Sequence, residues 1–379
     1  MMRHSTREKS SKDRWEIFRT LFSELENGHL HLRQRLNRLS EKGSELEGIL
    51  IREIEAFESW RYPCMDKMGR ITADIGNEEK LDYLSHIRKS HYFDIVQEAP
   101  FYWRIINKPN GYAGDAYMMR FIYDDRFEGE TPFGMFLHKH ALATKACQSV
   151  RNRRDFLKEQ ILNLKGGKVM SLAAGPAQEI IDVLNTCRDM CYQFIALDHD
   201  MDVLMKFHFE TQPPHEFRYA LANAFHFISG NYQTARPRRA MLKYCYPRTD
   251  FKGIRRFLST IKYDLEPLKG DTFDLVYTAG LYDYIKTYLL DKSKGTIALT
   301  RNLFHLVKPG GSLIIGNFSE NNPRDLRFVM DYIYDWKLIY RNKHEILDFA
   351  RAIPEKAIRN IQVIEEPLGI NYFLKIDKN

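Results

Sequence analysis

The sequence predicts an α/β protein in which a doubly wound, Rossmann-like parallel sheet follows an N-terminal α-helical region. Three observations lead to this fold class. Residues 168–180 read as a buried strand, a turn of small residues and a helix, which is how such a sheet presents its first crossover to a ligand. A second buried run, residues 192–197, ends in an acid, Asp198. Before residue 60, in contrast, apolar residues recur at helical spacing.

Length and composition are those of a soluble globular protein. The chain has 379 residues, of which 44% are hydrophobic and 28% charged, enough for one large domain or two ordinary ones. We expect a helical cap over residues 1–145 and a sheet domain over residues 146–379, with an insertion near residues 230–265. The net charge of +7 favours acidic partners slightly, and no basic stripe interleaved with aromatic residues indicates nucleic-acid binding.

Cysteine usage and the N-terminus indicate a cytoplasmic protein. Five cysteines are scattered without a zinc-site pattern, so we expect reduced thiols and no metal site. The first residues are charged and include no apolar h-region, so they do not resemble a signal peptide. No run of about eighteen apolar residues is present, so we expect no membrane span.

The N-terminal region reads as long amphipathic helices. Phe18, Phe22 and Leu25 begin one apolar series, and Leu32 to Phe57 continue it with a break expected at Gly43. The favoured interpretation is a packed cap or a dimer surface, so a homodimer through these helices is one expected assembly.

A turn precedes the next helix of this region. Pro109, Asn110 and Gly111 form strong turn chemistry, and Asp115 is placed to cap a helix over residues 116–123. Composition alone favours a turn with an N-cap over a loop that closes on a ligand. A helix over residues 141–164 then leads to the sheet, and its cluster of arginines at 151–154 is expected to be a solvated face.

The remaining strands are expected at residues 217–222, 273–278 and 311–317, with a β-rich end near 369–376. Asn223 follows the third strand, and Ala279 and Gly280 follow the fourth. Helices are expected at residues 253–261, 297–306 and 326–334, and the stretch between Asn223 and Phe273 is long enough to hold a lid.

The residues at the strand ends suit a nucleoside. An acid at the end of strand two, where Asp198 stands, is where such sheets bind ribose hydroxyls. Small residues at 173–177 allow a ligand to approach the backbone closely. The absence of a P-loop lysine is consistent with a ligand that lacks phosphate.

Taken together, these ordered landmarks resemble the class I S-adenosylmethionine (SAM) dependent methyltransferases. The first motif departs from the usual pattern, because Ser171 stands where that family usually has an acid. A narrower group shares this variant, and the chain resembles the proteins of extracellular-factor (3-hydroxypalmitic acid methyl ester) biosynthesis. The shared motifs stand at residues 111–115, 171–177, 280–284, 309–311, 316–318 and 335–341.

The resemblance implies SAM as cofactor and assigns roles to residues. Asp198 would bind the ribose diol, and Asn223 would accept from the adenine amino group, with His199 or Phe225 nearby. Rings of Tyr112, Tyr282 and Tyr284 would face the sulfonium. The cofactor-binding set is Ala173, Ala174, Gly175, Pro176, Asp198, His199, Asn223, Ala279, Gly280 and Tyr282, and the catalytic set is Tyr112, Asp115, Tyr282 and Asp283.

The acceptor determines which further groups are needed. A hydroxyl or amine nucleophile would need a base, for which Asp283 or Asp115 could serve. A carboxylate would need none, and the site should then offer cations such as Arg341 or Arg324.

Three functions are compatible with these residues. The first is a cytoplasmic enzyme that transfers a methyl group from SAM to a small molecule, with a carboxylate, as in fatty-acid methyl ester formation, the acceptor that the resemblance suggests. The second is a cyclase that converts SAM to azetidine-2-carboxylate and expels methylthioadenosine. The third is a non-catalytic SAM-sensing or scaffold protein whose helices bind a partner, against which the intact candidate catalytic loops argue.

Overall fold

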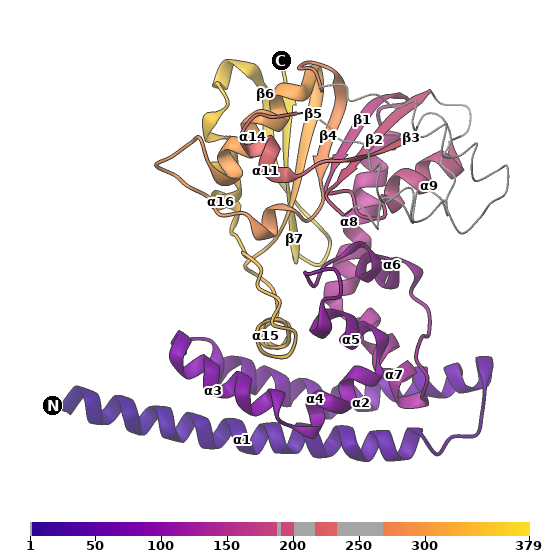
Figure 1. The fold of residues 1–379 in the computed structure, drawn as a ribbon, viewed down its shortest axis with the longest axis vertical. Coiled ribbons are helices and arrows are strands. Elements are labelled where there is room, and N and C mark those ends of the chain that lie inside the picture. The colour runs from indigo at the N-terminus through magenta and orange to yellow at the C-terminus, as the bar shows by residue number, and fades with distance from the viewer. Residues whose placement is uncertain (1, 188–190, 201–216, 233–267) are drawn as a thin grey trace. The chain divides into compact units, whose positions relative to one another are not determined.

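The computed structural model describes residues 2–187, 191–200, 217–232 and 268–379, and it forms two compact units (Figure 1). One unit comprises Met1–Gln148 and Asn322–Lys337, and the other comprises Ser149–Asn321 and Leu338–Asn379. The helix expected at residues 253–261 and most of the expected insertion, residues 233–265, lie outside the described residues.

The first unit is helical, as the spacing of apolar residues predicts. Phe18, Phe22 and Leu25 are buried along the first helix, and Leu46, Leu50 and Phe57 along the second. The expected break at Gly43 is the start of the second helix. In order, the elements are α1 (Met2–Leu36), α2 (Gly43–Thr72), α3 (Asn77–Arg88), α4 (His91–Ile95), η1 (Val96–Glu98), α5 (Pro100–Asn107), α6 (Ala116–Asp124) and α7 (Pro132–Ala143).

The second unit is built on a seven-stranded sheet in the order β3-β2-β1-β4-β5-β7-β6. Strands β1 to β5 pair in parallel, and β7 runs antiparallel to both β5 and β6. The predicted doubly wound α/β fold class is therefore confirmed. The strands are β1 (Gly167–Leu172), β2 (Tyr192–Asp198), β3 (Phe217–Leu221), β4 (Phe273–Thr278), β5 (Val307–Phe318), β6 (Ile358–Glu365) and β7 (Asn371–Lys378).

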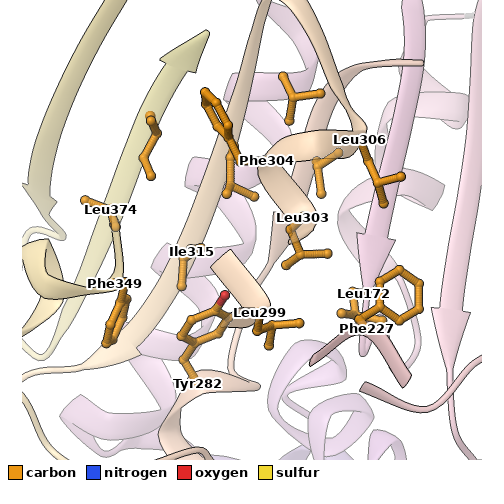
Figure 2. Close-up of a cluster of buried hydrophobic side chains, with 14 of the residues drawn as sticks. Leu172, Phe227, Tyr282, Leu299, Leu303, Phe304, Leu306, Ile315, Phe349 and Leu374 are labelled. Atoms are coloured by element: carbon orange, nitrogen blue, oxygen red, sulfur yellow. The ribbon is translucent and has the colours of Figure 1, made fainter. Parts of the chain in front are cut away.

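Helices cover both faces of this sheet. Successive side chains of a strand point to opposite faces, and in β1 and β4 the side chains on both faces are buried. On one face, Val169 and Leu275 pack with α8 (Lys145–Leu162) and α9 (Gln178–Thr186). On the other, Leu172 and Ile315 pack with α11 (Ala224–Ile228) and α14 (Gly295–Leu306). Figure 2 shows this second cluster, in which Leu299 and Leu303 of α14 lie beside Tyr282 and Leu172.

Two expected helices have different ends from those predicted. The helix expected over residues 141–164 is divided at Thr144, whose extended backbone separates α7 from α8. The helix expected over residues 326–334 begins earlier, as α15 (Arg324–Phe328), and continues as a π-helix, η3 (Val329–Ile333). Edge strand β6 was not predicted, because it has no buried run: four of its eight residues are exposed and four are partly buried.

The segment 322–337 leaves the sheet unit after β5 and belongs to the helical unit. Gly69 of α2 allows a close approach there, since a Cβ atom on it would lie 2.7 Å from the carbonyl oxygen of Arg324. The hydroxyl of Tyr332 also donates to the carbonyl oxygen of Thr72 at 3.2 Å. After this segment come α16 (Lys343–Leu347), η4 (Asp348–Ala352) and η5 (Glu355–Ala357).

Candidate active site

The turn after β1 has an unusual backbone. Ala173, Gly175 and Ala177 have φ values of +56°, +54° and +49°. The left-handed conformation costs a residue with a Cβ roughly 1–2 kcal/mol, so the surrounding fold must hold the two alanines in it. Ala174 donates its backbone N–H to the carbonyl oxygen of Leu197 at 3.0 Å, which ties the turn to β2. The result is a turn with little side-chain bulk at the carboxyl edge of the sheet.

Asp198 ends β2 and contacts this turn directly. Its Oδ2 accepts a hydrogen bond from the backbone N–H of Gly175 at 2.8 Å, and its Oδ1 accepts one from the N–H of Asp200 at 3.0 Å. The side chain is only 6% exposed. Nδ1 of His199 lies 3.4 Å from Oδ1, and this carboxylate raises the pKa of the His199 imidazole. Asp198 is thus an oriented acceptor beside the turn after β1.

Asn223 follows β3 and caps the short helix α11. Its Oδ1 accepts from the backbone N–H of Phe225 at 2.9 Å, which is the ordinary role of asparagine at an N-cap. The residue is exposed, and an amide oxygen can accept a second hydrogen bond. The ring of Phe225 is 72% exposed.

Gly280, after β4, lies against a buried arginine. A Cβ atom on Gly280 would stand 2.9 Å from Nη1 of Arg153. Arg153 comes from α8 and is only 5% exposed, so the expectation that this arginine lies on a solvated face is wrong. The helical spacing of Val150, Arg153 and Leu157, which are all buried, was the signal that could have placed Arg153 on the inner face of α8.

Two buried acids share this region with Arg153. Glu179 of α9 is 5% exposed and accepts a hydrogen bond from the hydroxyl of Tyr277 at 2.6 Å. Burial raises the pKa of the Glu179 carboxyl, and the charge of Arg153 opposes that shift. Burial also raises the pKa of Asp283 to about 7, against the hydrogen bond from Phe318 and the charges of Arg153 and Arg341. The charge of Arg153 therefore favours the ionised forms of both Glu179 and Asp283.

Asp283 lies in η2 (Tyr282–Tyr284) and ties the ends of β4 and β5 together. Its Oδ1 accepts from the backbone N–H of Phe318 at 2.7 Å, and its side chain is almost fully buried. A carboxyl group with a pKa near 7 can gain or lose a proton at neutral pH.

Tyr282 is turned into the core. Its hydroxyl is 2.9 Å from Oγ1 of Thr300, and the centroid of its ring lies 5.0 Å from that of Phe349. Figure 2 shows the rings of Tyr282 and Phe349 beside each other. No part of the side chain is exposed. The ring of Tyr282 therefore lies in the core and not at the turn after β1. Tyr284, two residues later, is 44% exposed.

The guanidinium of Arg341 donates hydrogen bonds to other parts of the sheet unit. One Nη1 hydrogen bond runs to the carbonyl oxygen of Tyr282 at 2.8 Å and another to Oδ1 of Asn317, while Nη2 donates to the carbonyl oxygen of Ile285. Through these contacts the guanidinium joins the segment after β4 to the end of β5.

The loop at residues 111–115 belongs to the helical unit. Asp115 caps α6 as predicted, since its Oδ1 accepts from the N–H of Met118 at 2.9 Å. The same oxygen accepts from Nε of Arg104 at 2.8 Å, and Oδ2 accepts from Nη2 of Arg104. Asp115 is fully buried, and Tyr112 is partly buried. The role of Tyr112 beside the sulfonium stays a prediction from the sequence.

Most of the expected cofactor residues meet at one edge. Asp198 is the last residue of its strand, and the other residues follow the carboxyl ends of parallel strands: residues 173–176, His199, Asn223, Ala279 and Gly280. The order of strands reverses between β1 and β4, and ligands of open α/β sheets bind at such a switch point. The turn after β1 and the end of β2 are therefore the candidate binding site.

Comparison with known proteins shows only distant similarity. No protein-family model matches the chain, and no curated protein matches it. Among solved structures, a protein of Bordetella parapertussis described as "a possible exported protein" is 12% identical, with 90% of this chain and 99% of that one covered and a TM-score of 0.47. The CMeT domain of the citrinin polyketide synthase is 8% identical, with 88% and 96% covered and a TM-score of 0.40.

A third similar structure holds a ligand. It is 1,6-didemethyltoxoflavin-N1-methyltransferase of Burkholderia thailandensis, with bound 1,6-didemethyltoxoflavin and S-adenosylhomocysteine, at 12% identity, 60% and 77% coverage and a TM-score of 0.35. These three proteins are similar to this chain in general fold, and what they bind or catalyse is a property of those proteins. The fold class of this chain stands on its own strand order.

Proposed function

We propose that the sheet unit binds SAM and that the protein transfers its methyl group to a small molecule, with a carboxylate such as that of a 3-hydroxy fatty acid as acceptor. The observation that carries the proposal is the contact of Asp198 with the turn after β1, where Oδ2 accepts from the N–H of Gly175 at 2.8 Å. A doubly wound sheet binds ribose hydroxyls through an acid at the end of its second strand, and the contact of Asp198 with the turn supports that role for it.

The residues present fit the parts of SAM. An ionised carboxylate has about four acceptor sites, so Asp198 can accept from the two ribose hydroxyls while it keeps its two backbone donors. Asn223 keeps acceptor capacity for the adenine amino group, and Phe225 presents an exposed ring beside it. Arg153, buried at Gly280, offers a positive charge to the carboxylate of the amino-acid end.

When bound, SAM supplies a methyl group on a positively charged sulfur, and transfer forms the oxygen–methyl bond as the sulfur–methyl bond breaks. The contribution of the protein is then positioning, which can supply about 7–11 kcal/mol of a barrier. A carboxylate acceptor is already ionised at neutral pH and needs no base. In this proposal Asp283 acts as a positioning residue, because its Oδ1 holds the N–H of Phe318 at the end of β5. Asp115 likewise positions its own loop through Arg104.

The binding step can be tested by itself. Isothermal titration calorimetry of the full chain with SAM, and separately with S-adenosylhomocysteine, should show binding of both. A folded protein that binds neither compound would contradict the proposal.

A further inference from the structure

A loop of the sheet unit presents adjacent apolar side chains to solvent. It runs from Lys286 to Lys294 and leads into α14 (Figure 1). Leu290 is fully exposed, at 104% of its reference area, while Leu289 is 46% and Tyr288 44% exposed. Single exposed leucines are ordinary on a protein surface, but neighbouring apolar side chains that share one exposed tip indicate an interaction site.

Hydrogen bonds join the two ends of this loop. The backbone N–H of Thr296 donates to the carbonyl oxygen of Lys286 at 3.1 Å, and the hydroxyls of Thr287 and Thr296 are 2.9 Å apart. Gly295 has a φ of +59°, and a Cβ atom there would lie 2.1 Å from the carbonyl oxygen of Lys286. The two ends of the loop are therefore closed against each other, and the exposure of the leucines is a property of the folded loop.

Lysines surround the apolar tip. Lys286, Lys292 and Lys294 are exposed on both sides of it. Asp291 is the acid within the loop, and it pairs with Nζ of Lys294 at 2.9 Å. The N–H of Ser293 also donates to Oδ1 of Asp291 at 3.1 Å, which fixes the turn that follows the leucines. The loop thus combines two exposed leucines, one exposed tyrosine and a net positive charge.

We propose that this loop docks the protein on the surface of an anionic lipid bilayer. Leucines can enter the boundary between headgroups and acyl chains, while tyrosine suits the interface itself. Lysines beside them are attracted to anionic headgroups, and their long stems let the charge stay in water. Among the described residues no helix is long and apolar enough to cross a membrane, so the attachment is to the surface. The proposal does not depend on the methyl-transfer reaction.

The test is co-sedimentation of the full chain with vesicles. Wild type should bind vesicles that contain phosphatidylglycerol in phosphatidylcholine more tightly than vesicles of phosphatidylcholine alone, and added salt should weaken that binding. Leu290→Ser should lower the partition coefficient by about tenfold, since it removes one leucine from the interface. Lys292→Gln should lower binding to the anionic vesicles and leave binding to phosphatidylcholine alone unchanged.

Leu81→Ser is the matched control, because Leu81 of α3 is 65% exposed in the other unit. It should bind vesicles like wild type, and thermal melting should show that all variants are folded. The proposal is overturned if wild type does not bind anionic vesicles or if Leu81→Ser loses as much binding as Leu290→Ser. It is also overturned if Leu290→Ser abolishes self-association in sedimentation velocity without changing vesicle binding, because the tip would then contact a second copy.

Discussion

Oδ2 of Asp198 accepts a hydrogen bond from the backbone N–H of Gly175 at 2.8 Å, across 23 residues of sequence. This bond joins the last residue of β2 to the centre of the turn after β1. The turn holds Ala173 and Ala177 in the left-handed conformation. The hydrogen bond therefore fixes the direction of the Asp198 carboxylate and helps to hold this turn.

Asp198→Asn should weaken SAM binding by roughly 1.5–3 kcal/mol, the usual contribution of hydrogen bonds to a charged group. The amide keeps one acceptor oxygen and the size of the side chain, so the fold should survive. Calorimetric titration measures the change, with Asp155→Asn on α8 as the control because its carboxylate is largely exposed. A SAM affinity equal to that of wild type would show that Asp198 does not bind the ribose.

Asp283 should make the protein less stable as pH rises. Its folded pKa of about 7 lies above the ordinary value of 3.8, so between these values the folded protein keeps a proton that the unfolded chain releases. The stabilisation is complete below pH 3.8 and is lost as pH rises through 7, by up to about 4 kcal/mol.

Asp283→Asn removes this titration and keeps an oxygen for the N–H of Phe318. In urea unfolding, the variant should therefore lose less stability than wild type between pH 5 and pH 8. Identical pH dependence in the two proteins would show that Asp283 does not titrate in this range.

Two buried histidines of the helical unit should contribute a pH dependence in the opposite direction. Burial lowers the pKa of His29 from 6.5 to about 3 and that of His138 to about 4. Above pH 6.5 both histidines are neutral in either state, but below it the unfolded chain takes up protons that the folded one does not. Each should cost roughly 2 kcal/mol of stability between pH 6.5 and pH 5.

His29→Gln should make the acid-induced loss smaller, as measured by urea unfolding at the two pH values. His31→Gln is the matched control, because His31 is exposed on the same helix. An equal loss in wild type and His29→Gln would mean that His29 takes up a proton in the folded protein.

Arg341 should be a structural residue. It donates to the carbonyl oxygens of Tyr282 and Ile285 and to Asn317, and a lysine cannot reproduce this fork. Arg341→Lys should lower the free energy of unfolding by roughly 2–4 kcal/mol, whereas Arg359→Lys, at an exposed position of β6, should change it little. If Arg341→Lys instead has wild-type stability and a raised KM for the methyl acceptor, Arg341 binds the substrate.

The strands other than β6 could be predicted because their signal is local. Buried runs such as residues 273–278 are continuous in the sequence, and the strand there has the predicted ends. The N-cap role of Asp115 is likewise set within four residues.

Long-range partners could not be predicted in this way. The acceptors of Arg341 in Tyr282 and Ile285 lie more than fifty residues before it in the chain, and the burial of Tyr282 depends on Phe349. Arg153 was missed because its arginine-rich neighbours suggested an exposed face, although its helical spacing from Val150 and Leu157 indicated the buried one.

The products formed from SAM provide the most direct test of the proposed chemistry. The purified full chain is incubated with SAM alone and with SAM plus a 3-hydroxy fatty acid, and the products are identified by mass spectrometry. Methyl transfer predicts no turnover with SAM alone, and S-adenosylhomocysteine together with the methyl ester when the acid is present. Enzyme-dependent methylthioadenosine and azetidine-2-carboxylate from SAM alone would contradict it.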